Sequence, residues 1–137
     1  MTDSARWQQN LAVVREMLAR ISAGDRDGYL GHLADDAEYV APYYPEMVPR
    51  RGRAELARML DGLFACFVRV SYTVTETFET TDPDLVIVEA RGDNEVLGSD
   101  RRYRNQYVMF VRFRDGKVAR WTEYSDPNVY HRAVDGP

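Results

Sequence analysis

Two alternating runs of residues on either side of Asp115-Gly116 constrain this chain more than any other stretch. An Asp-Gly pair in this setting predicts a β-hairpin, because a tight type I′ turn needs a positive φ at both central residues. Successive side chains of a strand point to opposite faces of a sheet. The hairpin predicted over residues 101–127 therefore sorts its own side chains into two faces.

The odd-numbered positions of this hairpin are expected to form its inner face, since aromatic and apolar residues dominate them. The inner face is predicted to hold Tyr103, Asn105, Tyr107, Met109, Val111, Phe113, Ala119, Trp121, Glu123 and Ser125. The outer face is predicted to hold Arg104, Gln106, Val108, Phe110, Arg112, Val118, Arg120, Thr122 and Tyr124.

Glu123 is the leading candidate for chemistry, because it is a carboxylate on the apolar face of the hairpin. A carboxyl group in such surroundings either pairs with a cation or has its pKa raised by desolvation. An ion pair with an arginine across the sheet is the structural alternative. If Glu123 faces a cavity, Tyr39, Asn105 and Tyr107 are expected to face it too, as ligand contacts or as core residues. Trp121 is expected to form part of the cavity wall.

Composition excludes several classes of function. A chain of 137 residues, 45% hydrophobic and 29% charged, is expected to form a single globular domain over residues 1–137. Its net charge of −4 argues against a nucleic-acid partner, which would favour a basic surface. The single cysteine excludes an internal disulfide and suits the cytoplasm. No apolar run reaches the ~20 residues that span a bilayer, so no membrane partner is expected. Two histidines without ligand spacing predict neither a metal nor another cofactor.

Three helices are predicted in the first half of the chain. The first covers residues 3–24, where apolar residues recur at helical spacing and Asp3 or Ser4 can cap the amino terminus. A short second helix is expected within residues 25–36. The third begins at about residue 53 and carries a broad apolar face to residue 67.

The period then changes from helical to two, which indicates a sheet. A proline-containing segment, residues 43–51, is expected to be an irregular loop at the rim of a cavity. Residues 92–100 are expected to form a loose turn. The predicted strands are residues 38–41, 68–80 and 85–90 and the two arms of the hairpin. Helices first and a meandering antiparallel sheet last predict an α+β fold.

Several stretches resemble the SnoaL-like branch of the NTF2-like superfamily, which includes ketosteroid isomerases, limonene-epoxide hydrolases and scytalone dehydratases. The resemblance is carried by residues 23–25, 33–37, 51–53 and 115–127. Residues 78–84 together with the terminal hairpin are similar to the phenazine-biosynthesis A/B proteins. The resemblance implies a cone of three helices packed on a curved, mostly antiparallel sheet that encloses a pocket. Such a pocket would hold a small hydrophobic or polycyclic molecule.

Most catalytic positions of these relatives carry other residues here. The ketosteroid isomerase tyrosine, general base and acidic oxyanion-hole residue would fall at Met17, Ala41 and Met109, and the phenazine histidine would fall at Met59. These substitutions therefore do not support steroid-type enolisation with that set of residues, and they argue against phenazine chemistry as such. The strand glutamate of the phenazine proteins and the last aspartate of the epoxide hydrolases both fall on Glu123.

Arg91 and Asp93 are predicted to join the substrate site on a weaker basis. They match the Arg-x-Asp pair of the epoxide hydrolases if the alignment slips by one residue. Such a slip moves a side chain to the opposite face unless a bulge absorbs it, and Gly92 permits a bulge. A solvated pair at a turn is the alternative.

Two functions are consistent with these residues. The first is a cofactor-independent acid-base enzyme that acts on a small, largely apolar metabolite by isomerisation, cyclisation, epoxide opening or dehydration, as in secondary metabolism. The second is a non-catalytic small-molecule-binding protein with the same fold. A homodimer is expected in either case, because apolar residues ringed by arginines suit an isologous interface, although arginine stems can also shield scattered surface residues. The residues concerned are Val108, Phe110, Tyr124, Arg104, Arg112 and Arg120.

Overall fold

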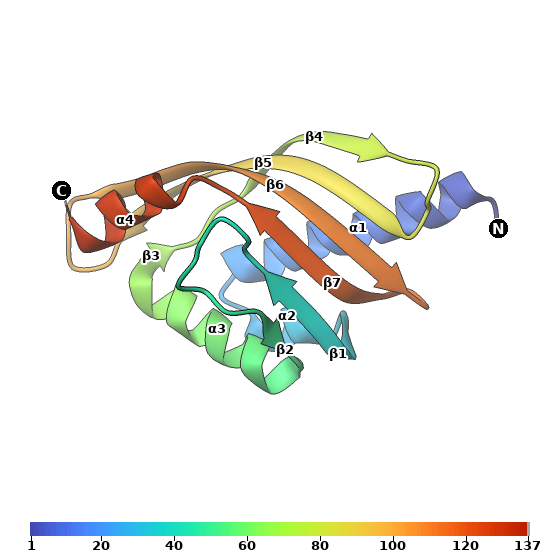
Figure 1. Ribbon diagram of the computed structural model, residues 1–137, viewed down its shortest axis with the longest axis horizontal. Helices are drawn as coiled ribbons and strands as arrows, with labels where there is room; N and C mark the ends of the chain where they lie inside the picture. The colour runs from blue at the N-terminus through green and yellow to red at the C-terminus, as the bar shows by residue number, and fades with distance from the viewer. Residues whose placement is uncertain (137) are drawn as a thin grey trace.

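The computed structural model describes residues 1–136 and builds them around one curved sheet (Figure 1). The hydrogen-bonded strand order is β2-β1-β7-β6-β5-β3, and β4 pairs with β5. All strand pairs are antiparallel except β1 with β7, which is parallel. The strands are β1 (Leu33–Val40), β2 (Arg50–Arg51), β3 (Phe67–Arg69), β4 (Thr73–Glu79), β5 (Leu85–Val96), β6 (Arg102–Arg114) and β7 (Lys117–Tyr124).

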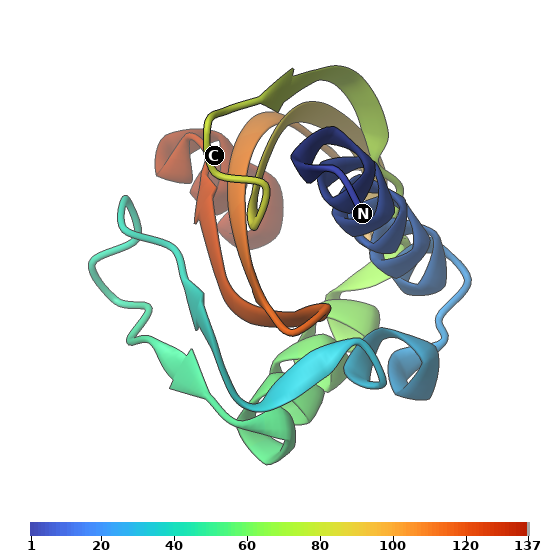
Figure 2. The same ribbon diagram turned by 90° about the vertical axis from the view of Figure 1, so that its right-hand side faces the viewer.

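Helices cover the concave side of the sheet, which curls like a half-barrel in Figure 2. The helices are α1 (Asp3–Ser22), α2 (Arg26–Leu30), α3 (Arg53–Cys66) and α4 (Pro127–Asp135). The α1 helix begins after Thr2, whose hydroxyl accepts a hydrogen bond from the amide of Ala5 at 3.0 Å. The α+β cone predicted from the sequence is confirmed, with one helix more than expected.

The main core lies between α1 and the sheet. Val14 and Met17 on α1 and Val86 and Val88 on β5 are all 0% exposed. Complete burial of a side chain of this size contributes about 1.5–3 kcal/mol. No helix within residues 1–136 is both long enough and apolar enough to cross a membrane.

The hairpin predicted around Asp115-Gly116 is confirmed. Asp115 has φ 52° and Gly116 has φ 76°, which are the positive values that a type I′ turn requires. Burial alternates along β6 with the odd-numbered residues inside, as predicted.

The prediction for Val118 was wrong. Val118 pairs with Phe113 while Arg120 pairs with Arg112, so β7 contains one extra, unpaired residue, Ala119. This β-bulge places Val118 inside, at 0% exposure, and restores Trp121 to the same face.

Two predicted strand boundaries were wrong because pairing extends the strands. The β1 strand begins at Leu33 rather than at residue 38, since Leu33 pairs with Val118 on β7. The β5 strand continues to Val96 through the region expected to be a turn, and its even-numbered residues stay buried throughout. Arg50 and Arg51, expected in an irregular loop, form the short strand β2 against β1.

The predicted strand over residues 68–80 is split into β3 and β4. Between them the amide of Ser71 donates to the side-chain oxygen of Asn94 on β5 at 2.7 Å, and not to a backbone carbonyl of that strand. The backbone therefore leaves the ladder at this point, and Tyr72 lies in the interruption.

The α4 helix was not predicted, although its start carries a recognisable signal. Asp126 accepts a hydrogen bond from the amide of Asn128 at 2.9 Å, and Pro127 occupies the first turn. His131 also lies on this helix.

Candidate active site

A cavity of about 320 Å³ lies inside the cone. Residues from all four helices and from β1, β2, β3, β6 and β7 line it. Its wall is unusually aromatic, since Phe67, Trp121 and seven tyrosines contribute to it. The tyrosines are Tyr29, Tyr39, Tyr44, Tyr72, Tyr103, Tyr107 and Tyr130. Hydroxyl groups on an apolar wall suit a ligand that has a flat apolar body and a few oxygen atoms.

Glu123 is the one carboxylate that borders the cavity among residues 1–136. The phenol of Tyr39 donates a hydrogen bond to its Oε2 at 3.0 Å, and the indole Nε1 of Trp121 donates to its Oε1 at 3.2 Å. Burial raises the pKa of Glu123, and the two hydrogen bonds oppose that effect without cancelling it. A proton therefore binds this carboxylate at a higher pH than it would bind an exposed glutamate.

The parallel pairing of β1 with β7 brings the two anchors of Glu123 together. Tyr39 and Trp121 are direct partners in this pairing, and Glu123 follows two residues later on the same face of β7. A phenol can donate one hydrogen bond, and Tyr39 donates its hydrogen bond to Glu123. Tyr39 thus positions the carboxylate, and a hydrogen bond to a ligand oxygen must come from a different hydroxyl group.

Tyr29 and Tyr72 supply such hydroxyl groups. Both side chains line the cavity, and within residues 1–136 neither hydroxyl hydrogen-bonds another residue. Burial, with the nearby charge of Glu123, raises the pKa of both phenols, so they remain protonated donors at neutral pH. The ring of Tyr29 lies 6.3 Å from that of Trp121. These donors therefore share the cavity with the carboxylate.

Tyr107 lines the cavity as predicted and is 5% exposed. Its ring packs edge-on against that of Tyr72, with 5.3 Å between the centroids. A Cβ atom at Gly92 would lie 3.3 Å from the Tyr107 ring and 3.0 Å from the carbonyl oxygen of Ser71. The glycine therefore leaves the space that Tyr107 occupies.

Asn105 was expected to line the cavity. It shares the inner face of β6, but it does not line the cavity. Its amide nitrogen donates to the hydroxyl of Tyr103 at 2.9 Å and to the carbonyl of Asp126 at 3.0 Å, and its oxygen accepts from the amide of Gln106 at 2.9 Å. These bonds occupy the side chain, so Asn105 supports Tyr103 and the start of α4 from behind the wall.

Arg91 and Asp93 were wrongly predicted to join the site. The pairing of β5 with β6 runs without a register shift, so Gly92 forms no bulge. Both side chains are exposed on the outer face. Asp93 forms ion pairs with Arg102 at 2.7 Å and Arg104 at 3.3 Å, and the hydrogen bond from Arg102 chiefly lowers its pKa.

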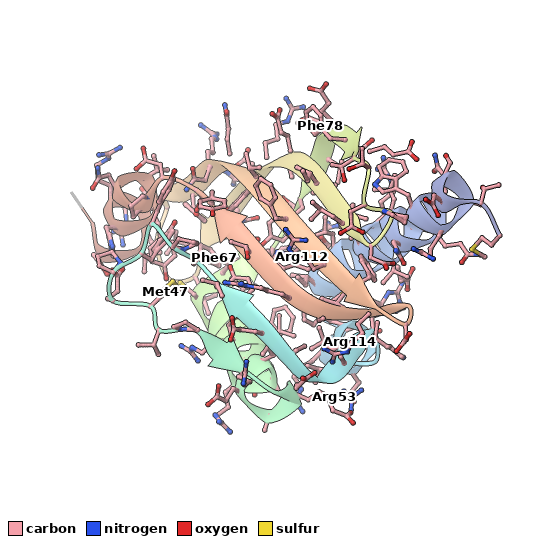
Figure 3. All side chains as sticks on the ribbon, turned by 45° about the vertical axis from the view of Figure 1, so that its right-hand side comes forward. Met47, Arg53, Phe67, Phe78, Arg112 and Arg114 are labelled. Atoms are coloured by element: carbon pink, nitrogen blue, oxygen red, sulfur yellow. The ribbon has the colours of Figure 1, made fainter. Side chains whose placement is uncertain are left out.

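The predicted rim loop is held against α4. Tyr44 shares a hydrogen bond of 2.8 Å with Ser125, and Glu46 lies 2.8 Å from the Nε2 of His131. Met47 on this loop and Phe67 both line the cavity, and they lie toward the same end of the molecule in Figure 3. The loop therefore contributes directly to the wall.

Sequence reasoning did not assign Tyr29, Tyr72, Arg50 or Arg58 to the site, although all four line the cavity. The tyrosines are indistinguishable by pattern from core aromatic residues. Of the positions where relatives carry catalytic groups, Ala41 and Met59 line the cavity, and Met17 and Met109 are fully buried.

An aromatic cavity with one anchored carboxylate lies inside a cone of helices on a curved sheet, which is the fold of the NTF2-like superfamily. A model of the SnoaL-like domain matches residues 14–121, so the chain belongs to the SnoaL-like family. Protein YesE of Bacillus subtilis is 26% identical over 132 residues, which cover 95% of this chain and 90% of YesE.

Three solved structures show the same fold. A candidate isomerase from Bacillus subtilis aligns with a TM-score of 0.88 at 22% identity and covers 100% of this chain and 98% of its own. A phenazine biosynthesis-related protein from Pseudomonas aeruginosa aligns at 0.83 and 21% identity, covering 98% and 90%. A candidate polyketide cyclase from Xanthomonas campestris aligns at 0.82 and 20% identity, covering 94% and 98%. The fold expected from the resemblance is therefore confirmed.

Proposed function

We propose that this chain is a cofactor-independent acid-base enzyme that acts on a small, largely apolar metabolite. The observation that carries the proposal is Glu123, a carboxylate of raised pKa that Tyr39 and Trp121 hold at the wall of an aromatic cavity. A general base works best when its pKa approaches the working pH, and burial moves Glu123 in that direction.

The reaction that suits this arrangement is proton abstraction next to a carbonyl group. The carboxylate of Glu123 takes a proton from the carbon, and the electron pair of the broken C–H bond moves onto the carbonyl oxygen to form an enolate. Tyr29 or Tyr72 donates a hydrogen bond to that oxygen as its charge develops. Glu123 becomes a neutral acid that can return the proton.

The fate of the enolate distinguishes the reaction types. Return of the proton to a different carbon gives isomerisation. Attack of the enolate carbon on a second carbonyl of the same molecule forms a C–C bond, and the new alkoxide then takes the proton from Glu123, which gives cyclisation. Relatives described as a candidate isomerase and a candidate polyketide cyclase favour these two reactions over epoxide opening or dehydration.

A non-catalytic binding protein is the second candidate. Methionine and alanine at Met17, Ala41, Met59 and Met109 favour it, because none of these side chains can transfer a proton. The binding protein would use the same wall and would need no base.

Proton exchange into a simple carbon acid separates the two candidates. We expect the protein to accelerate deuterium uptake next to the carbonyl of 2-tetralone in D₂O, measured by ¹H NMR. Glu123→Gln keeps the shape but removes the base, and should slow this exchange roughly 100-fold or more. Glu89→Gln is the matched control, since Glu89 is exposed on the outer face of β5. Binding of 2-tetralone without accelerated exchange, or equal exchange by Glu123→Gln, would reject the enzyme in favour of the binding protein.

A further inference from the structure

The cavity carries two cations that the chemistry of Glu123 does not use. Arg50 on β2 and Arg58 on α3 both line it. Together with Glu123 they are the only side chains of Arg, Lys, Asp, Glu or His that border the cavity within residues 1–136. The protein as a whole has a net charge of −4, but its cavity wall carries an excess of positive charge.

Strand pairing explains why Arg50 faces inward. Arg50 is the direct partner of Tyr39, and Arg51 is the direct partner of Glu38. Directly opposed residues share a face of the sheet. Arg51 thus meets Glu38 on the outer face, where they form an ion pair at 3.5 Å, and Arg50 lies on the inner face with Tyr39.

Helical spacing explains the position of Arg58. The residues of α3 that line the cavity include Arg58, Met59, Gly62, Leu63 and Cys66, which form one stripe at intervals of three and four. Asp61, one turn from Arg58, is engaged by Arg26 at 2.9 and 3.0 Å. It therefore leaves Arg58 without a carboxylate partner.

Neither cation has a protein counter-charge. Within residues 1–136, Arg50 and Arg58 form no ion pair, with Glu123 or with any other carboxylate. Most other arginines lie against carboxylates, as Arg53 does with Asp35 and Arg104 with Asp93. Arg50 is half-buried and Arg58 is exposed, so solvent reaches both guanidinium groups. A guanidinium group offers paired donors that match the geometry of a planar carboxylate, and its charge attracts an anion.

We infer that the molecule bound in this cavity is an aromatic or polycyclic carboxylic acid, whose carboxylate is held by Arg50 and Arg58 while its apolar body lies among the tyrosines. This inference rests on the proposed function and names its substrate class. One part of the molecule, the carbon acid, lies near Glu123 and reacts. Another part, the carboxylate, is bound by the two arginines.

Two probes that differ only in a carboxylate test the inference. 6-Hydroxy-2-naphthoate and 2-naphthol share a bicyclic phenol, and calorimetry at low ionic strength measures the affinity of the full chain for each. We expect the acid to bind roughly 10-fold more tightly or better, the usual scale of a charge-assisted contact. The preference should shrink as salt is added, because the contact is ionic.

Arginine variants assign the preference to the cavity. Arg50→Gln and Arg58→Gln should each reduce it to about 3-fold or less, since one bidentate partner is lost. Arg112→Gln should retain it, because Arg112 lies exposed over the outer face of the sheet (Figure 3). Arg50→Lys and Arg58→Lys keep the charge without the fork and should restore part of the preference, which excludes misfolding as its cause.

The outcomes separate this inference from the proposed function. A preference for the acid that persists in Glu123→Gln supports the arginine site whatever that variant does to deuterium exchange. Equal affinity for the two probes, or a preference that survives in both glutamine variants of the arginines, overturns the inference. In that case Glu123-dependent exchange would leave the proposed function standing.

Discussion

Removal of one hydroxyl group, by Tyr39→Phe, tests the electrostatics of Glu123 directly. In the wild type the phenol donates to Oε2 at 3.0 Å, a bond that stabilises the ionised carboxylate and lowers its pKa against the effect of burial. A hydrogen bond to a charged group contributes about 1.5–3 kcal/mol, and one between neutral groups about 0.5–1.5 kcal/mol. The difference, about 1–1.5 kcal/mol, is the extra stabilisation that this bond gives to the charged form of Glu123 over its neutral form. Tyr39→Phe should therefore raise the pKa of Glu123 further.

The stability of the variant should depend on pH in a defined direction. Because the folded-state pKa of Glu123 is raised, protonation favours the folded state at low pH, and this contribution is lost as pH rises through the folded pKa. In Tyr39→Phe the loss extends to a higher pH, since the folded-state pKa is higher while the unfolded-state pKa is unchanged. The free energy of unfolding should fall by about 1.5–3 kcal/mol at alkaline pH, where Glu123 is charged, but by only about 0.5–1.5 kcal/mol at acidic pH.

Carboxyl ¹³C NMR gives the pKa, and urea unfolding at several pH values gives the stability. Tyr107→Phe is the matched control, because Tyr107 lines the same cavity but does not hydrogen-bond Glu123. That control should lose stability equally at all pH values and leave the pKa of Glu123 in place. An unchanged or lowered pKa in Tyr39→Phe would refute the account of how this carboxylate is tuned.

Two further predictions concern the rest of the molecule. A homodimer through the outer face of β6 and β7 should give twice the 15.8 kDa chain mass in light scattering. Phe110→Glu should give the monomer mass, because Phe110 packs on Tyr124 in that face with 5.8 Å between ring centroids. A wild-type monomer at micromolar concentration contradicts the dimer. Asn105→Ala should lose about 1–3 kcal/mol of unfolding free energy in urea, since it leaves the buried hydroxyl of Tyr103 without this hydrogen bond. The exposed neighbour Gln106→Ala should change stability by less than about 0.5 kcal/mol, and equal losses would contradict the role of Asn105.

The position of Glu123 could be predicted because the turn and the alternation within the hairpin together fix the register of its two strands. Asp115-Gly116 places the turn, and alternation on β6 then identifies the inner face. The bulge at Ala119 left no comparable signal, so Val118 was assigned to the outer face, whereas Trp121 and Glu123 beyond it were assigned correctly. A register error there would have displaced the whole site.

Arg91 and Asp93 could not be placed because β5 begins with apolar residues on both faces. Leu85–Val88 shows no alternation in sequence, so nothing in it tells which parity is buried. Asn105 was assigned to the correct face, but the helix that covers its end of the strand was not foreseen. Arg50 became a cavity residue only through its pairing with Tyr39, a contact between distant segments that sequence spacing does not reveal.

The parallel pair of β1 and β7 has a consequence for how the chain folds. Tyr39 and Glu123 meet across 84 residues, and β7 lies in the sheet between β1 and β6. Contacts of such long range are slow to form, because the chain loses loop entropy before they stabilise it. During synthesis, both β1 and β6 present open edges until β7 leaves the ribosome, and unpaired edges promote aggregation. The strand that brings Glu123 to the cavity therefore also ends the period in which the nascent chain is most exposed to misassembly.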